Sequence, residues 1–273
     1  MPVSRSRKPK PNRRPKGGRQ RPAAGAGRAA GAGRSRRPLV VAVAIAVVLF
    51  LLVGTVSALL AGGGDDGADD AVGDGQETVV PLPDDHPALQ LARRDADDPL
   101  AVGAVDAPVV MIEYADFQCA FCGTHARDTY QRLLAEYVDQ GVLRMEFRNF
   151  PINGPESDAA ARAAWAAGRQ GRFWEFYQAA FAEEFHLNSG RFTEDGLRVL
   201  AAEAGVPDVE LLLTDMESAE AGEAVGADAE EAMDLGIATP PAFLLNGHPI
   251  EGARPFEEFA TVIDQLAEAE GDA

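Results

Sequence analysis

Two cysteines, separated by two residues, stand in a chain that has no others. Cys119 and Cys122 follow a short apolar run and precede a helical pattern. At such a strand-to-helix junction, the unpaired N–H groups and the dipole of the helix stabilise the first sulfur as a thiolate. The second sulfur, one turn further on, can resolve a mixed disulfide. The spacing therefore predicts thiol–disulfide exchange, with Cys119 as the nucleophile and Cys122 as the resolving thiol.

Other uses of the cysteine pair fit less well. A disulfide that encloses two residues removes little entropy from the unfolded chain. A zinc site needs four ligands, whereas Cys119, Cys122 and His125 supply three, and we expect His125 on the helix surface. Haem attachment needs a histidine where Gly123 stands. We therefore predict no metal site and no cofactor. Delivery of Cu(I) by two soft thiolates and a binding module with inert cysteines remain alternatives.

A glutamate interrupts the apolar strand before the cysteines. Glu113 stands six residues before Cys119, and the period of two in a strand places it on the same face as Met111 and Ala115. A carboxyl group buried beneath the resolving thiol has a raised pKa and can shuttle the proton of that thiol. We expect this catalytic role for Glu113. The alternative is a partly exposed glutamate at a strand end.

The elements around these residues alternate between strand and helix patterns. β-Branched, apolar runs predict strands, and apolar residues at helical spacing predict helices. An Asn-Gly pair predicts a two-residue hairpin turn, because both residues accept a positive φ. The predicted order is a strand at 109–112, a helix from the cysteines to about 140, a strand at 142–150, helices over 156–235, a hairpin at 242–251 and a helix at 256–269.

Several motifs occur in the order found in the DsbA-like branch of the thioredoxin superfamily. They are DFQCAFC at 116–122, RNFP at 148–151, FWEF at 173–176, GIATP at 236–240 and NG at 246–247. The chain resembles this family over about residues 98–270. The resemblance implies an α/β thioredoxin fold with a helical insertion at about 156–235, and the activity of a thiol:disulfide oxidoreductase.

The resemblance also implies further site residues. In such proteins the pair that matches Thr239 and Pro240 has a cis peptide bond facing the C-x-x-C, which for X-Pro costs only about 0.5–1 kcal/mol. The Thr239 backbone can then pair with an extended substrate as an added strand. We expect Thr239, Pro240 and Phe121 to bind substrate, and Glu113 matches the family's acidic residue. Ala120-Phe121 lacks the histidine of the strongest oxidants, which leaves the reduction potential open.

Charge and hydropathy divide the chain before the cysteines. Net charge is −18, yet the first 38 residues carry 13 Lys and Arg and no acid, whereas the remainder carries 12 Arg and 43 acids. Residues 39–60 are uncharged, and at about 1.5 Å per residue they span about 33 Å as a helix, enough for a hydrocarbon core of about 30 Å. The basic flank predicts a cytoplasmic N-terminus. A signal peptide cleaved near 56–58 is the alternative.

These patterns predict four parts: a basic cytoplasmic tail at 1–38, a transmembrane helix at 39–60, a flexible, disordered acidic linker at 61–98 and a DsbA-like domain at 99–273. The predicted protein is a single-pass cell-membrane oxidoreductase whose extracytoplasmic domain forms disulfides in exported proteins. Its expected partners are exported proteins with cysteine thiols, a membrane redox partner and membrane lipid, but no nucleic acid, because the tail lacks interleaved aromatic residues. A reductase or isomerase of the same fold is the alternative, separated by reduction potential.

Overall fold

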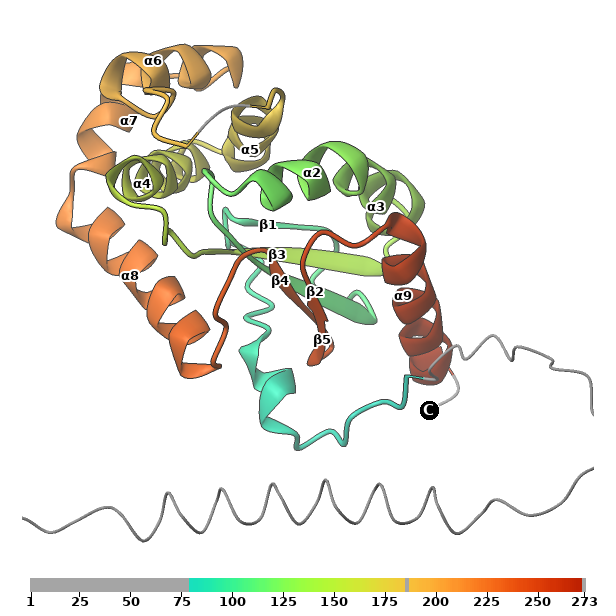
Figure 1. The fold of residues 1–273 in the computed structure, drawn as a ribbon. Coiled ribbons are helices and arrows are strands. Elements are labelled where there is room, and N and C mark those ends of the chain that lie inside the picture. Colours follow the sequence, from blue (N-terminus) through green and yellow to red (C-terminus); the bar gives the residue numbers. More distant parts are fainter. Residues whose placement is uncertain (1–78, 185–186, 272–273) are drawn as a thin grey trace, which may run out of the picture. The chain divides into compact units, whose positions relative to one another are not determined.

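The computed structural model describes residues 79–184 and 187–271, which fold around a five-stranded sheet (Figure 1). The strand order is β1-β3-β2-β4-β5, with β2 and β3 parallel and the other neighbours antiparallel. The strands are β1 (Ala101–Val102), β2 (Val109–Ala115), β3 (Leu143–Asn149), β4 (Ala242–Leu245) and β5 (His248–Glu251). Parallel neighbours require a crossover, and the helices after the cysteines supply it. The predicted strands and hairpin are confirmed.

Helices cover both faces of the sheet. Side chains alternate along a strand, so Met111 and Ala115 face a core shared with α2, α5 and α9, whereas Val110 and Ile112 face α8 and η1. The elements outside the insertion are η1 (Pro87–Leu91), α2 (Ala120–Asp128), α3 (Tyr130–Leu133), the π-helical turn η2 (Leu134–Val138) and α9 (Phe256–Gly271). Glu113 belongs to the α2 face, as the period of two predicts.

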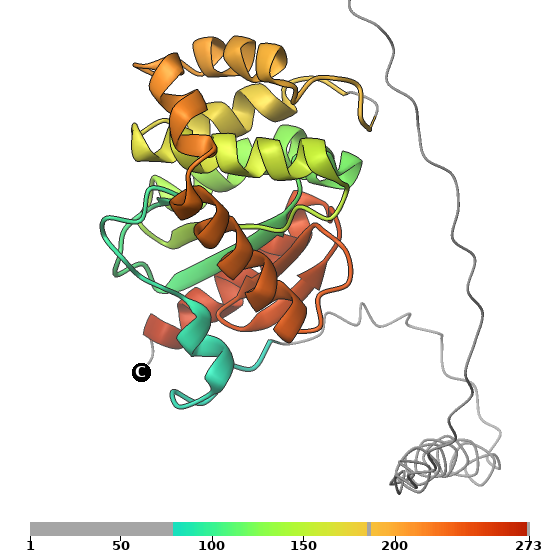
Figure 2. The same ribbon diagram turned by 90° about the vertical axis from the view of Figure 1, so that its left-hand side faces the viewer.

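Five helices between β3 and β4 form the helical insertion. They are α4 (Pro155–Arg169), α5 (Phe173–Phe181), α6 (Glu194–Glu203), α7 (Val209–Met216) and α8 (Ala219–Asp234). Figure 2 shows α4 to α7, in yellow-green to orange, together at one end of the domain, while α8 runs down beside the sheet. The aromatic side chains of α5 join this layer to the sheet: the ring of Phe173 packs against that of Phe147 in β3, with ring centroids 5.0 Å apart. These helices occupy the segment at 156–235 over which the sequence predicts helices.

The segment before β1 differs from the linker that the sequence predicts. Residues 79–100, here called the strap, lie against the domain, although the linker is predicted to continue to residue 98. The backbone N–H groups of Arg93 and Arg94 donate hydrogen bonds to the Glu146 carboxylate at 2.9 and 2.8 Å. A composition rich in Asp, Pro and Gly suggests a solvated tether, but it does not reveal partners more than 50 residues further along the chain.

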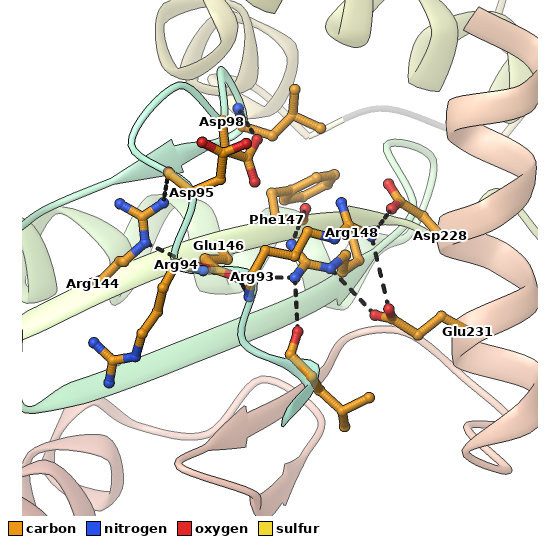
Figure 3. Close-up of polar contacts among 12 residues, drawn as sticks. Arg93, Arg94, Asp95, Asp98, Arg144, Glu146, Phe147, Arg148, Asp228 and Glu231 are labelled. Atoms are coloured by element: carbon orange, nitrogen blue, oxygen red, sulfur yellow. Dashed lines mark hydrogen bonds and ion pairs between the residues drawn. The ribbon is translucent and has the colours of Figure 1, made fainter. Parts of the chain in front are cut away.

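A buried ionic network fastens the strap to the sheet (Figure 3). Glu146 accepts hydrogen bonds from Arg144 Nε at 2.9 Å and from Arg148 Nη2 at 2.8 Å, and these three side chains are almost fully buried. Arg93 of the strap binds Asp228 of α8 at 2.6 Å. Arg148 Nε of the same strand also binds Glu231 of α8 at 3.2 Å, so β3 holds both the strap and α8 in place.

The predicted membrane span at 39–60 and the basic tail lie outside the described residues. Within the part of the chain that the structure describes, no helix combines the length and the apolar character needed to cross a membrane.

Candidate active site

The chain turns from β2 into α2 at the cysteines, and Cys119 is the N-cap residue of α2. Its backbone is extended, with φ −81° and ψ 119°, and its Sγ accepts a hydrogen bond from the N–H of Cys122 at 3.3 Å. Side chains at this position satisfy the N–H groups that a helix start leaves unpaired. The predicted place of Cys119 at a helix N-terminus is therefore confirmed. Cys119 is half-buried and Cys122 is fully buried, and both are free thiols.

The two thiols differ in acidity. A hydrogen bond from the Cys122 side chain, helped by the N–H groups of Cys122 and Phe121, lowers the pKa of Cys119 against the opposing effect of burial. Burial raises the pKa of Cys122 well above its ordinary value, and the neighbouring Cys119 raises it further. Near neutral pH the accessible sulfur is thus the better nucleophile, because the thiolate is the reactive form.

Asp116 organises the turn before the cysteines, a role that the sequence patterns do not single out. Its buried carboxylate accepts hydrogen bonds from the N–H of Gln118 at 2.7 Å and from the N–H groups of Ile152 and Asn153 at 2.8 and 2.9 Å. An aspartate that binds the N–H two residues onward is typical of an Asx turn. That local pattern was available in the sequence, but the bonds to the loop after β3 were not.

Gln118 connects the same turn to the helical insertion. Its side-chain amide donates to Ser157 Oγ of α4 at 3.1 Å, and its side-chain oxygen accepts from the N–H of Asn188 at 2.7 Å. The residue directly before Cys119 is therefore held from the side of the insertion. Nothing in the local sequence pattern distinguishes this buried glutamine from an exposed one.

The loop at residues 239–241, here called the proline loop, lies over Cys119, but its cis peptide bond is one residue later than expected. The resemblance places it between Thr239 and Pro240; the structure has it between Pro240 and Pro241. Both are X-Pro bonds with a similar intrinsic preference, so the local sequence does not separate them. Thr239 is exposed, while Pro240 is buried and its carbonyl oxygen lies 3.3 Å from Cys119 Sγ. Pro240 offers an acceptor at the sulfur but no N–H donor.

Glu113 is buried beneath the cysteines, with 1% of its surface exposed. Burial raises the pKa of Glu113, a hydrogen bond from Tyr177 lowers it and a negative Cys119 raises it, and together these effects bring it to about 8. The partly exposed strand-end glutamate is therefore the wrong alternative. A carboxyl group with a pKa near working pH can exchange a proton with a neighbouring thiol.

His125 is buried, which contradicts the predicted surface position. Its ring packs against Phe243 and Phe259, with centroids 4.4 and 5.2 Å away, and neither ring nitrogen has a hydrogen-bond partner among the described residues. Burial lowers the pKa of His125 to about 3. The prediction failed because the side of α2 that carries His125 faces the sheet. In the part of the chain described, no group of three or more His, Cys, Asp and Glu side chains could hold a metal ion.

His125 makes the domain sensitive to acid. Its pKa is about 3 in the folded state and 6.5 ordinarily, so the unfolded chain binds the proton more readily. Stability is then lost as pH falls from 6.5 towards 3, by about 1.4 kcal/mol per pH unit. We expect this contribution to be missing from His125→Leu, so the difference in unfolding free energy between variant and wild type, from urea titrations at pH 7 to pH 3.5, should change by this amount per pH unit. A difference that does not change with pH would refute the assignment.

The surface around Cys119 combines an apolar rim with a cavity. Phe121 is 68% exposed, and Ile152, whose N–H binds Asp116, is also exposed. A cavity of about 390 Å³ opens beside Cys119 and is lined in part by Arg127. Cys119 is therefore open to solvent through this cavity.

Comparisons with known proteins agree with this geometry. A family model described as thioredoxin matches residues 95–265. The probable disulfide bond formation protein D of Bacillus cereus is 34% identical over 152 residues, which cover 54% of this chain and 70% of that protein. The crystal structure of oxidised BdbD from Bacillus subtilis aligns with a TM-score of 0.58 at 22% identity, over 63% of this chain and 94% of that one. A thioredoxin-like oxidoreductase from Silicibacter pomeroyi aligns with a TM-score of 0.55 at 28% identity, over 66% and 95%.

A thioredoxin-type sheet with a C-x-x-C at the start of its first long helix defines a class of redox proteins. The chain belongs to the thioredoxin family, within which it is a DsbA-like thiol:disulfide oxidoreductase.

Proposed function

We propose that this oxidoreductase forms disulfides in exported proteins through the Cys119–Cys122 pair. The observation that carries the proposal is the asymmetry of the pair: Cys119 accepts the N–H of Cys122 at the helix start and is reachable, whereas Cys122 is buried. A nucleophilic sulfur must be accessible and stabilised as an anion, while a resolving sulfur only needs to reach its neighbour.

The exchange proceeds in two displacements. In the first, a client thiolate attacks Cys119 Sγ of the oxidised pair; the S–S bond breaks and its electron pair stays on Cys122 Sγ, which takes the proton of the Glu113 carboxyl group. In the second, another client thiolate attacks the client sulfur of the mixed disulfide, and Cys119 leaves as a thiolate. The client is then oxidised by two electrons and the enzyme is reduced by two.

The substrate segment is proposed to run past the proline loop. Pro240 presents its carbonyl oxygen beside Cys119, so a client N–H can bind there, and exposed Thr239 lies next to it. Strand-like pairing at such a loop uses backbone groups and tolerates many side chains. Phe121 adds an apolar contact. Pro240 has no N–H. It therefore offers the client fewer donors than a threonine at the same position would.

Membrane attachment completes the proposal. The uncharged run at 39–60 supports a single transmembrane helix, with the tail at 1–38 in the cytoplasm and the domain on the extracytoplasmic side. The strap shortens the proposed linker to residues 61–78. A membrane redox partner must then reoxidise the reduced pair, since each client leaves two electrons on it. The oxidative direction is supported by the relatives named for disulfide bond formation.

Trapping of mixed disulfides tests the proposal. We expect Cys122→Ser to accumulate covalent adducts through Cys119 when it is mixed with clients that carry a disulfide, because the Cys119 thiolate attacks that disulfide, a client thiolate leaves, and the resolving thiol that would release the adduct is missing. Adducts are detected as bands on non-reducing gels that disappear with a reductant. Cys119→Ser is the matched control and should form none. Equal adduct yields from both variants, or none from either, would reject the assigned roles. A reduction potential near about −270 mV instead of about −120 mV would favour a reductase.

A further inference from the structure

Tyr177 of the helical insertion reaches the carboxyl group of Glu113. Its hydroxyl oxygen lies 3.1 Å from Oε1 and 3.5 Å from Oε2 of Glu113. Both side chains are essentially without exposed surface. Tyr177 lies on α5, whereas Glu113 lies in the middle of β2. The insertion therefore supplies a polar partner to a carboxyl group of the sheet.

A tyrosine hydroxyl suits both protonation states of its partner. It donates to an ionised carboxylate, and it can accept from a protonated carboxyl group, because it is donor and acceptor at once. A hydrogen bond to an ionised group is stronger than one between neutral groups. Burial by itself disfavours the ionised form of Glu113. The stronger hydrogen bond from Tyr177 to the carboxylate opposes this effect and favours the ionised form.

The other titratable groups near Glu113 do not have this effect. They are Cys119 at the N-cap of α2, Cys122 on α2 and Tyr130 on α3. The residues paired with Glu113 in β3 and β4 are Phe147 and Phe243. An ionised Cys119 repels the carboxylate. Tyr177 is thus the neighbour whose contact with Glu113 stabilises the carboxylate.

We infer that Tyr177 is a positioning residue of the exchange reaction, whose hydroxyl orients Glu113 and sets the pH at which Glu113 gains and loses its proton. The inference rests on the role proposed above for Glu113. When the S–S bond breaks, the Glu113 proton moves to Cys122 Sγ, and the Tyr177 hydroxyl donates to the carboxylate that remains. In the reverse direction, the carboxylate takes the Cys122 proton back.

The test compares two tyrosine-to-phenylalanine variants. Tyr177→Phe removes the hydroxyl and keeps the ring. Tyr130→Phe is the matched control, because its ring lies 5.1 Å from that of Tyr177 in the same cluster, while its hydroxyl interacts with Gln178. Reduction of the disulfide form by a small dithiol is followed from pH 5 to 10, and the carboxyl ¹³C resonance of Glu113 is titrated in parallel. We expect Tyr177→Phe to move both inflections upward by about one pH unit and Tyr130→Phe to leave them in place.

Two outcomes separate this inference from the proposed function. If Tyr177→Phe leaves the inflections unchanged while Glu113→Gln abolishes the kinetic one, Tyr177 has no positioning role but Glu113 keeps its own. If Glu113→Gln also leaves the kinetic inflection in place, the role of Glu113 is wrong and the inference is overturned with it. Should the phenylalanine variant not fold, 3-fluorotyrosine at position 177 provides a stronger donor of nearly equal size. It is expected to move the inflections downward, and an unchanged titration would equally overturn the inference.

Discussion

Replacing Glu146 by glutamine is expected to destabilise the domain by about 3–5 kcal/mol, because it leaves buried arginines without their anionic partner. The carboxylate of Glu146 binds Arg144, Arg148 and the backbone N–H groups of the strap (Figure 3). A glutamine of the same shape has one acceptor oxygen, and its NH₂ group points donors at donors. For a domain of this size the melting temperature should fall by about 10 °C or more.

The loss of stability in Glu146→Gln is expected to depend on pH. Burial alone raises the pKa of Glu146, but hydrogen bonds from Arg144, Arg148 and the strap lower it to about 2. Because the folded-state pKa lies below the ordinary 4.5, the contribution of the carboxylate is complete above pH 4.5 and is lost as pH falls through 2. The difference between wild type and Glu146→Gln should therefore shrink by about 1.4 kcal/mol per pH unit below pH 4.5.

A surface glutamate provides the control for this experiment. Glu257 pairs with Arg132 at 2.7 Å, but its side chain is 72% exposed. Exposed ion pairs contribute little to stability. Glu257→Gln should leave the melting temperature nearly unchanged in thermal unfolding followed by circular dichroism. Similar losses of stability in both variants, or a pH-independent loss for Glu146→Gln, would show that the buried Glu146 carboxylate does not stabilise the domain through its ionic contacts.

The strand that carries this network shows where pattern analysis succeeds and where it stops. Apolar Leu143, Met145 and Phe147 alternate with charged residues, and this period of two predicts a strand with one buried face. The same alternation puts Glu146 on the opposite face of the strand. That face is buried too, because the strap and α8 cover it, and neither cover can be read from a local window. His125 was misplaced for the same reason on the other side of the sheet.

Short-range chemistry was easier to predict. Asn246 and Gly247 have φ values of 42° and 83°, as the hairpin turn requires, and Cys119 caps α2 as the spacing predicts. These features depend on neighbours within a few residues. Other features depend on segments that only the fold brings together. They are the cis bond before Pro241, the hydrogen bonds of Asp116 with the loop after β3 and the contact between Tyr177 and Glu113. The reactive pair was therefore predictable, whereas most of its surroundings were not.

Glu113→Gln is the same substitution on the neighbouring strand, and its expected effect on stability has the opposite sign. Glu113 has a pKa of about 8 in the folded state, raised first by burial, against an ordinary 4.5. Between these values the unfolded chain loses its proton while the folded chain keeps it, so wild-type stability falls as pH rises. The variant does not titrate and should gain relative to wild type by about 1.4 kcal/mol per pH unit from pH 4.5 to 8, then level off.

Glu113→Gln should be less active than wild type, although it is expected to be more stable. Without a proton donor beneath Cys122, reduction of the Cys119–Cys122 disulfide is expected to slow on the order of 10²-fold near pH 7, the lower end of the range for general acid catalysis. The ratio of wild-type to variant rates should shrink as pH rises and wild-type Glu113 loses its proton, and the ionisation of the attacking thiol cancels from this ratio. Stopped-flow rates with a dithiol and urea titrations on the same samples give both quantities. A more stable variant with an undiminished rate would assign Glu113 to the core alone, whereas a slower but less stable variant would show that its carboxyl group holds the fold together.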